Sequence, residues 1–180
     1  MSTPTKQVAF KSLGCKLNFS ETSTIARDCV SIGFECVDFD QKADFYVINT
    51  CSVTENANRD ARKLIRKAKL KNPESHVAII GCYAQLNPEE LSKIDGVDVV
   101  LGAEEKFNIL DYLNEKELKK SPITAYSQIE HVNDFKPSYS LDERTRSYLK
   151  VQDGCDYNCS FCTIPLARGK SRSAEITKVI

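Results

Sequence analysis

The sequence lacks the features that would direct a protein to a membrane or identify a common nucleotide site. No apolar run approaches the roughly 20 residues of a membrane span, and Met1 to Gln7 contains no apolar signal-peptide core. Lys and Arg together number 25, as do Asp and Glu, so the net charge of zero identifies no class of partner. Neither G-x-G-x-x-G nor G-x-x-x-x-G-K-[ST] occurs. We therefore expect a cytoplasmic protein with no membrane partner.

Cysteine, by contrast, is abundant, with eight residues in a chain of 180. In a reducing cytosol, grouped cysteines more often bind metal than form disulfides. Cys155, Cys159 and Cys162 follow the spacing C-x3-C-x2-C after a predicted strand at Tyr148–Gln152. Three thiolates on one short loop suit an iron–sulfur cluster with one open iron. A zinc site or a disulfide remains an alternative, although closed zinc sites normally take four protein ligands.

The chain before this loop alternates predicted strands and helices. Asn18 has the form of a helix N-cap with Glu21 as its capping-box partner, and Asn87-Pro88 opens a later helix. Such alternation predicts an α/β fold, a doubly wound parallel sheet covered on both faces, over residues 5–118. Residues 119–146 are predicted to be a linker with a short strand near Ile123. The expected strands are 8–13, 34–37, 45–49, 77–80 and 98–101, and the expected helices begin near 18, 53, 87 and 105.

Three further cysteines, Cys15, Cys51 and Cys82, share one context. Each directly follows a predicted strand and precedes a predicted helix. In an open parallel sheet these loops emerge at the carboxyl edge, where ligand sites form, and helix N-termini favour thiolates. We expect a second three-cysteine cluster there, the alternative being ordinary cysteines at strand ends. Cys29 and Cys36 are interpreted as small residues of the core.

The loop containing Cys155 resembles the cluster loop of radical S-adenosylmethionine enzymes, and further motifs resemble the methylthiotransferases of that superfamily. The sequence Gly-Cys-Lys-Leu-Asn around Cys15 is most similar to the corresponding motif of the branch that acts on N6-threonylcarbamoyladenosine at position 37 of tRNA. The branches acting on isopentenyladenosine-37 of tRNA or on a ribosomal protein aspartate remain alternatives. The similar motifs are Lys11–Asn18 (KSLGCKLN), Val47–Thr54 (VINTCSVT), Gly81–Gln85 (GCYAQ), Val151–Cys155 (VQDGC) and Ile164–Gly169 (IPLARG).

The resemblance implies two [4Fe–4S] clusters and S-adenosyl-L-methionine as cofactors. Cys155, Cys159 and Cys162 would hold the cluster that reduces S-adenosylmethionine to a 5′-deoxyadenosyl radical, with Phe161 against the adenine. Cys15, Cys51 and Cys82 would hold the auxiliary cluster, whose open iron carries the sulfur to be transferred. The implied partners are the tRNA anticodon loop and an electron donor protein such as a flavodoxin or ferredoxin. We assign no acid–base residue, since the difficult chemistry belongs to the cofactors.

The resemblance also implies that residues 147–180 begin a radical S-adenosylmethionine domain whose remaining strands are absent, as is an RNA-binding domain. We expect these 180 residues alone to lack methylthiotransferase activity. Two other classes stay open: a zinc- or RNA-binding module without catalysis, and an α/β interaction domain with incidental cysteines. The basic residues between Arg59 and Lys67, and those between Arg168 and Arg172, are candidates for RNA contact or for simple solvation.

Overall fold

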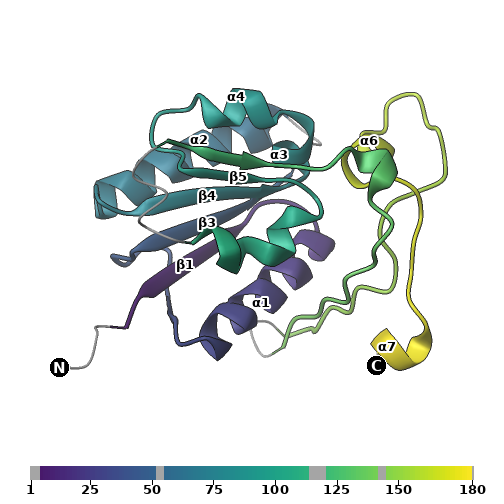
Figure 1. Cartoon of the computed structure of the whole chain (residues 1–180), viewed down its shortest axis with the longest axis horizontal. Helices are drawn as coiled ribbons and strands as arrows, with labels where there is room; N and C mark the ends of the chain where they lie inside the picture. Colours follow the sequence, from purple (N-terminus) through teal and green to yellow (C-terminus); the bar gives the residue numbers. More distant parts are fainter. Residues whose placement is uncertain (1–4, 52–54, 114–120, 142–144, 180) are drawn as a thin grey trace.

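A parallel sheet of six strands forms the centre of the computed structural model (Figure 1). The structure describes residues 5–51, 55–113, 121–141 and 145–179, and at residues 55–58 it describes the backbone alone. The strand order is β2-β1-β3-β4-β5-β6, and every neighbouring pair is parallel. The strands are β1 (Gln7–Ser12), β2 (Glu35–Val37), β3 (Phe45–Thr50), β4 (His76–Gly81), β5 (Val99–Leu101) and β6 (Ile123–Ala125).

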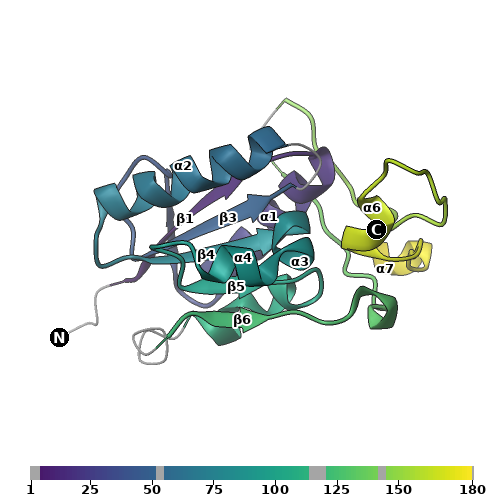
Figure 2. The ribbon, with the colours of Figure 1, turned by 90° about the horizontal axis from the view of Figure 1, so that it is seen from above.

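Helices cover both faces of this sheet, so the predicted doubly wound architecture is confirmed (Figure 2). The second, third and fourth helices pack on one face, whereas the first helix and a 3-10 helix pack on the other. The helices are α1 (Lys16–Ser31), α2 (Glu55–Lys71), α3 (Cys82–Leu86), α4 (Pro88–Ser92), η1 (Glu105–Tyr112), η2 (Ile129–His131), α6 (Ile164–Arg168) and α7 (Ile176–Val179).

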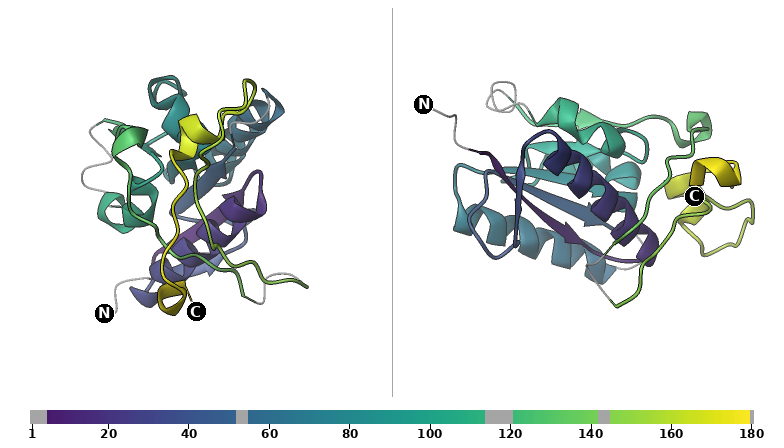
Figure 3. Two further views of the ribbon diagram at one scale, coloured as in Figure 1. Left: turned by 90° about the vertical axis from the view of Figure 1, so that its right-hand side faces the viewer. Right: turned by 90° about the horizontal axis from the view of Figure 1, so that it is seen from below.

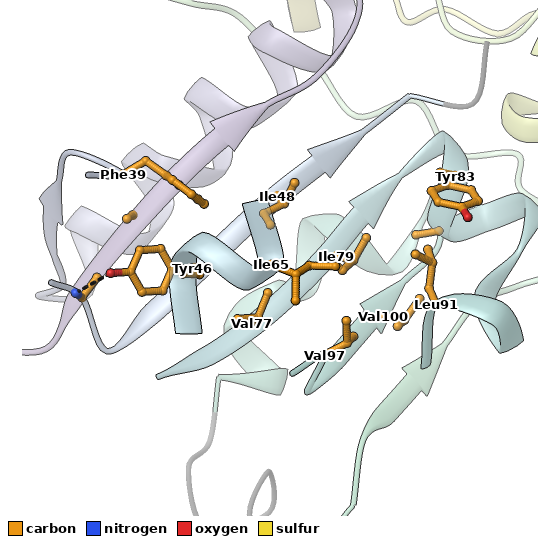
Figure 4. Packing of buried hydrophobic residues seen from close by; sticks show 14 residues of the cluster. Phe39, Tyr46, Ile48, Ile65, Val77, Ile79, Tyr83, Leu91, Val97 and Val100 are labelled. Atoms are coloured by element: carbon orange, nitrogen blue, oxygen red, sulfur yellow. Dashed lines mark hydrogen bonds between the residues drawn. The ribbon is translucent and has the colours of Figure 1, made fainter. Parts of the chain in front are cut away.

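The central strands β3 and β4 are apolar over most of their length, as suits strands that are buried on both sides. On one face, Ile48 of β3 and Ile79 of β4 pack with Ile65 of α2 and Leu91 of α4 (Figure 4). On the other face, Val47 belongs to a second core cluster with residues of α1 and η1. Cys29 of α1 is fully buried in that second cluster, which confirms its interpretation as a core residue.

Several predicted boundaries are wrong. Helix α1 begins at Lys16, with Cys15 at its N-cap, so Asn18 is an interior helical residue rather than the cap. Cys36 lies exposed on the short edge strand β2 instead of in the core, and its thiol contacts the Ala26 carbonyl oxygen. The expected helix at 105 is the 3-10 helix η1. The capping box proposed for Ser52–Glu55, and the end of the acidic helix expected to reach residue 118, lie outside the described residues.

Beyond β5 the chain adds one strand and then leaves the sheet. Strand β6 confirms the short strand expected near Ile123, and it pairs in parallel with β5. The strand predicted at Tyr148–Gln152 is wrong: this stretch is extended but forms only one antiparallel bridge, between Tyr139 and Leu149. The reason is that its inward side chain is the charged Lys150, which turns toward other charges and not toward an apolar core.

The segment after β6 lies across one end of the sheet and alongside α1 (Figure 3). Tyr139 accepts a hydrogen bond from Arg27 of α1 through its carbonyl oxygen at 2.7 Å, and its ring lies 3.9 Å from the Arg27 guanidinium carbon. Tyr148 makes an edge-to-face contact with Phe19, also of α1. Helix α6 packs against α3. The chain is thereby brought back over the carboxyl edge of the strands.

Candidate functional site

The three cysteines predicted to form the auxiliary site all stand at the carboxyl edge of the sheet. Cys15 follows β1, Cys51 follows β3 and Cys82 follows β4. The chain order reverses between β1 and β3, because β2 lies on one side of β1 and all later strands lie on the other. Such a reversal is where open α/β sheets bind ligands. The cysteines therefore occupy the position at which this fold normally forms a site.

Hydrogen bonds fasten the three cysteine-bearing loops to one another. The Asn18 amide donates to the carbonyl oxygens of Leu13 and Thr50, at 3.3 and 2.9 Å, and so joins the ends of β1 and β3. Asn49 donates to the Asn18 carbonyl at 3.0 Å. The Thr50 hydroxyl donates to the Ile80 carbonyl at 2.7 Å, which joins the ends of β3 and β4. Polar side chains thus hold these strand ends in a fixed relation.

The first two cysteine loops approach each other at Gly14. Its φ of 114° lies in a region that glycine favours, and a Cβ built there would fall 2.5 Å from Cys51 Cβ and 3.1 Å from Cys51 Sγ. The Cys15 thiol donates to Asn18 Oδ1 at 3.4 Å. Cys51 is buried, Cys82 is partly buried and Cys15 is exposed. Only glycine at position 14 permits this approach of the two loops.

Among the residues that the structure describes, no three or more His, Cys, Asp or Glu side chains are gathered as a metal site. The roles of Cys15, Cys51 and Cys82 as metal ligands, and those of Cys155, Cys159 and Cys162, therefore stay predictions. The structure places the first three on one sheet edge and the second three on one loop. Three thiols on neighbouring strand ends, with a glycine making room for one of them, suit an iron–sulfur cluster by donor chemistry.

A buried ionic network lies behind this edge, and its centre is Glu21 of α1. The carboxylate accepts from Lys106 Nζ at 2.7 Å and from Lys150 Nζ at 2.9 Å. Arg168 of α6 binds both of its oxygens, at 3.0 and 3.2 Å. Glu21 has no solvent exposure, and its three cationic partners are almost as fully buried. Buried charges persist only when they are paired and hydrogen-bonded in this way.

Asp153 extends the network toward the second cysteine loop. It is two residues before Cys155, and its carboxylate binds Lys150 at 2.6 Å and Arg168 at 2.8 Å. Arg172 reaches the same carboxylate at 3.6 Å. Arg168 also donates to Asn18 Oδ1 at 2.7 Å. Through Arg168, the network therefore connects Asn18, which joins the loops of Cys15 and Cys51, with Asp153, which lies at the start of the loop of Cys155, Cys159 and Cys162.

The network changes the ionisation of its members. Burial would raise the pKa of the Glu21 carboxyl, but the charges of Lys106, Arg168 and Lys150 hold that pKa well below its usual range. Burial would also raise the pKa of the Asp153 carboxyl, but the charges of Arg168 and Lys150 lower that pKa to about 2. Burial raises the pKa of the Cys82 thiol, against the opposing charges of Arg168 and Lys106. Both carboxylates are thus ionised at neutral pH, facing a larger number of cations.

The loop of Cys155, Cys159 and Cys162 is closed at its base by backbone pairing. Asp153 and Arg172 form an antiparallel bridge, and the Cys155 amide donates to the Gly169 carbonyl at 3.0 Å. Gly154 has a φ of 70°, and a Cβ there would collide with the Lys170 carbonyl oxygen. The Cys162 amide donates to the Cys159 carbonyl at 3.1 Å. The loop is therefore held at its two ends by the network and by this bridge.

Two aromatic side chains of this loop point into solvent. Phe161, predicted to contact adenine, is 90% exposed, and Tyr157 is 78% exposed. The same loop contributes Cys155 and Asn158 to a pocket of about 630 Å³, which Leu166 of α6 also lines. Neither aromatic side chain is among the residues that line this pocket. The cofactor-binding role of Phe161 stays a prediction.

Sequence reasoning missed the ionic network almost completely. Glu21 was assigned to a capping box, and Lys106, Lys150 and Asp153 were given no role. Arg168 was a candidate for RNA contact, but the structure buries it, so that assignment is wrong. The one local signal was Lys150 within the apolar stretch Tyr148–Val151, where a lone charge implies either a solvated edge or a buried partner.

The basic side of α2 remains on the surface. Arg59, Lys63, Arg66 and Lys67 are exposed, and some of the cations have acidic neighbours: Arg62 binds Glu90 at 2.7 Å, and Lys67 binds Asp40. Exposed pairs of this kind contribute little stability and exchange readily for other partners. Within the described residues, none of the helices has the length and apolar character needed to cross a membrane.

Comparisons with known proteins give a consistent result. Residues 7–102 match the family described as "Uncharacterized protein family UPF0004". The chain is 41% identical over 177 residues to a protein of Bacillus subtilis named threonylcarbamoyladenosine tRNA methylthiotransferase MtaB, with 96% of this chain and 39% of that protein covered. A protein of the same name from Aquifex aeolicus is 41% identical over 178 residues, covering 97% of this chain and 43% of the relative.

Relatives with a second name, referring to dimethylallyladenosine, also match the chain. A protein of Flavobacterium psychrophilum named tRNA-2-methylthio-N(6)-dimethylallyladenosine synthase is 31% identical over 176 residues, with 95% of this chain and 37% of that protein covered. The chain therefore spans about two-fifths of the length of the curated relatives it matches.

Proposed function

We propose, on the premise that the chain belongs to the family described as "Uncharacterized protein family UPF0004", that it is part of a tRNA methylthiotransferase acting on N6-threonylcarbamoyladenosine at position 37. The observation that carries the proposal is the similarity to the relatives named MtaB over nearly the whole chain. Because the chain spans only about two-fifths of those relatives, the activity belongs to the whole protein. The sequence Gly-Cys-Lys-Leu-Asn around Cys15 supports assignment to the same branch of methylthiotransferases.

In this proposal, Cys15, Cys51 and Cys82 hold an auxiliary [4Fe–4S] cluster. Their placement at the reversal point of the sheet supports the assignment, as does the close approach permitted by Gly14. Cys15 also stands at the N-cap of the 16-residue helix α1, whose positive end favours a thiolate. The protein's own task here is to fix three sulfurs on three strand ends and to leave one metal position open.

Cys155, Cys159 and Cys162 hold the second cluster, and Phe161 provides a surface for the adenine of S-adenosylmethionine. When bound, the two clusters and S-adenosylmethionine would supply the electron, the radical and the sulfur that methylthio transfer requires. The loop positions its sulfurs through the bridge between Asp153 and Arg172 and through the Cys155–Gly169 hydrogen bond.

The proposed partners are a tRNA anticodon loop, in which unstacked bases are accessible, and a flavodoxin or ferredoxin as electron donor. A tRNA substrate would place the whole protein in the cytoplasm. The exposed basic residues of α2 are candidates for the RNA backbone. Phosphate contacts of this kind would make binding fall as salt rises.

Anaerobic reconstitution with iron and sulfide tests the two cysteine sets separately. We expect about eight irons in the starting chain and about four in each of two variants, Cys15/Cys51/Cys82→Ala and Cys155/Cys159/Cys162→Ala. A Cys29/Cys36→Ala variant is the matched control and should retain the full count. Loss of all iron in either triple variant would contradict two independent clusters. Zinc without iron in every protein would favour a zinc- or RNA-binding module without catalysis.

The same variants test the remaining classes. Metal content unchanged by Cys15/Cys51/Cys82→Ala would indicate an α/β interaction domain with incidental cysteines. Turnover on isopentenyladenosine-37 tRNA would favour the second tRNA branch once the whole protein is assayed. Turnover on a ribosomal protein aspartate would favour the third branch. The 180-residue chain alone is expected to show no turnover on any of these substrates.

A further inference from the structure

Arg168 is the residue through which the C-terminal segment contacts the edge that bears Cys15, Cys51 and Cys82. It is the last residue of α6, and α6 packs against α3, the helix that begins with Cys82. Its guanidinium binds Glu21, Asp153 and Asn18 together. A planar group with five donors suits such simultaneous binding, which an ammonium group cannot reproduce.

The network around Arg168 carries more positive than negative charge. Four cations, Lys106, Lys150, Arg168 and, at 3.6 Å, Arg172, face two carboxylates, those of Glu21 and Asp153. An unmatched charge in a buried region is costly unless an opposite charge lies near it. The network therefore favours an additional anionic group close to its surface.

Cys82 begins α3, the helix against which α6 packs, so it lies next to the helix that ends with Arg168. The charges of Arg168 and Lys106 oppose the rise in the pKa of the Cys82 thiol that burial causes. Cys15 and Cys51 are linked to the same guanidinium indirectly. Arg168 Nη2 donates to Asn18 Oδ1 at 2.7 Å, and the Asn18 amide donates to the carbonyls of Leu13 and Thr50, at the strand ends that precede these two cysteines. The strand ends before two of the three cysteines are thus connected to one buried cation.

We infer that Arg168 is a positioning residue for the auxiliary site: through Asn18 it fixes the strand ends that precede Cys15 and Cys51, and its charge stabilises the anionic ligand set that these cysteines form with Cys82. This inference rests on the proposed function, in which these cysteines hold a cluster. Charge and hydrogen bonds at cluster sulfurs are known to set reduction potentials. Arg168 thereby makes the auxiliary site dependent on the C-terminal segment that supplies it.

A purely structural role for Arg168 is the competing explanation, and Lys150 separates the two. Lys150 is equally buried and binds the same two carboxylates, Glu21 and Asp153. Among the described residues, its ammonium group forms no hydrogen bond or ion pair with Asn18. Lys150→Met therefore damages the network as Arg168→Met does, while leaving the contacts between Arg168 and the cysteine loops in place.

The test uses the 180-residue chain carrying Cys155/Cys159/Cys162→Ala, so that only the auxiliary cysteines remain to bind a cluster. Arg168→Met, Arg168→Lys and Lys150→Met are added singly, and thermal unfolding confirms that each variant folds. The first readout is Co²⁺ affinity, followed by thiolate-to-cobalt absorption. The second is the reduction potential of the cluster after anaerobic reconstitution.

We expect Arg168→Met to weaken Co²⁺ binding about tenfold or more, the usual effect of losing a group that orients metal ligands, and to make the cluster potential more negative. Arg168→Lys should recover part of the affinity, because the charge remains but the bond to Asn18 is lost. Lys150→Met should bind Co²⁺ within about threefold of its parent. If Arg168→Met does not fold, the comparison between Arg168→Lys and Lys150→Met decides by the same criterion.

Equal losses in the Arg168 and Lys150 variants, or no loss in either, would overturn the inference while leaving the proposed function standing. Co²⁺ binding that depends on Arg168, in a parent that forms no iron–sulfur cluster, would support the inference and contradict the proposed auxiliary cluster. A parent that binds neither Co²⁺ nor a cluster would contradict both.

Discussion

The guanidinium of Arg168 binds both carboxylate oxygens of Glu21, at 3.0 and 3.2 Å, although 147 residues separate the two in sequence. Glu21 lies one and a half turns into the helix that follows Cys15, and Arg168 lies shortly after Cys162. The pair therefore joins the surroundings of the two predicted cysteine sites within one buried contact. The stability of the fold and the position of the cysteine loops are therefore coupled through this contact.

Replacing Glu21 by Gln should destabilise the chain by about 3 kcal/mol or more, because three buried cations lose their shared carboxylate. Urea unfolding followed by circular dichroism measures this change. Glu35→Gln is the control, since Glu35 is exposed and its carboxylate accepts a hydrogen bond from the Gln7 side chain at 3.0 Å; it should stay within about 0.5 kcal/mol of the parent. Equal effects of the two substitutions would contradict the importance of the network.

Acid should destabilise the chain through Asp153. Its pKa of about 2 in the folded protein is below the usual value of about 3.9. A lowered pKa stabilises the fold above the unfolded-state value, and this contribution is lost as the pH falls through the folded-state value. We expect a loss on the order of 2 kcal/mol between about pH 5 and pH 2 from this residue. Unfolding of the parent and of Asp153→Asn across that range measures it, and identical pH dependence would refute the assignment.

Gly14→Ala should destabilise the chain by more than the backbone strain of an alanine at positive φ, because the new methyl group also collides with Cys51. An alanine there meets Cys51 Cβ and Sγ, whereas an alanine at Gly33, with a similar φ of 98°, meets nothing within 4 Å. Gly33→Ala thus measures the strain alone, roughly 1–3 kcal/mol. We expect Gly14→Ala to cost more and to reduce iron bound by the auxiliary cysteines, as measured by iron analysis in the Cys155/Cys159/Cys162→Ala background. Normal iron content in Gly14→Ala would show that Cys51 tolerates displacement.

Phe161→Ala should leave stability unchanged, within about 0.5 kcal/mol, because the ring is 90% exposed. If Phe161 contacts the adenine, the same substitution should weaken S-adenosylmethionine binding to the reconstituted chain several-fold, as measured by calorimetry. Tyr157→Ala is the matched control, being an exposed aromatic of the same loop. A larger loss of affinity in Tyr157→Ala would move the predicted adenine contact to that residue.

The sheet was predictable from the sequence because its signals are local. Strands β3 and β4 are continuous apolar runs bounded by polar or glycine residues, and each strand end is marked by a cysteine. The cysteine positions followed from topology, since parallel strands place their carboxyl ends together. Short helices such as α3 and α6, with five residues each, carry too little periodicity to be recognised.

The ionic network was not predictable because its partners are remote. Asn18 and Glu21 fit the spacing of a capping box, yet their side chains bind Arg168, 150 and 147 residues away. Nothing within a few residues of Glu21 indicates a buried cation. The same holds for Lys150, whose apolar neighbours predicted a strand although no strand lies beside it in the described part of the chain.

The long sequence separations within the network also have a consequence for biosynthesis. The sheet is complete once residue 125 has emerged from the ribosome, whereas Lys150 and Arg168 follow later. Domains generally fold as their residues emerge, so we expect a nascent stage in which the sheet exists and Glu21 still faces water. Protease resistance of ribosome-bound chains stalled after residue 125 and after residue 179 measures this stage. During it, the edge bearing Cys15, Cys51 and Cys82 still lacks α6, the helix that packs against α3 in the completed chain.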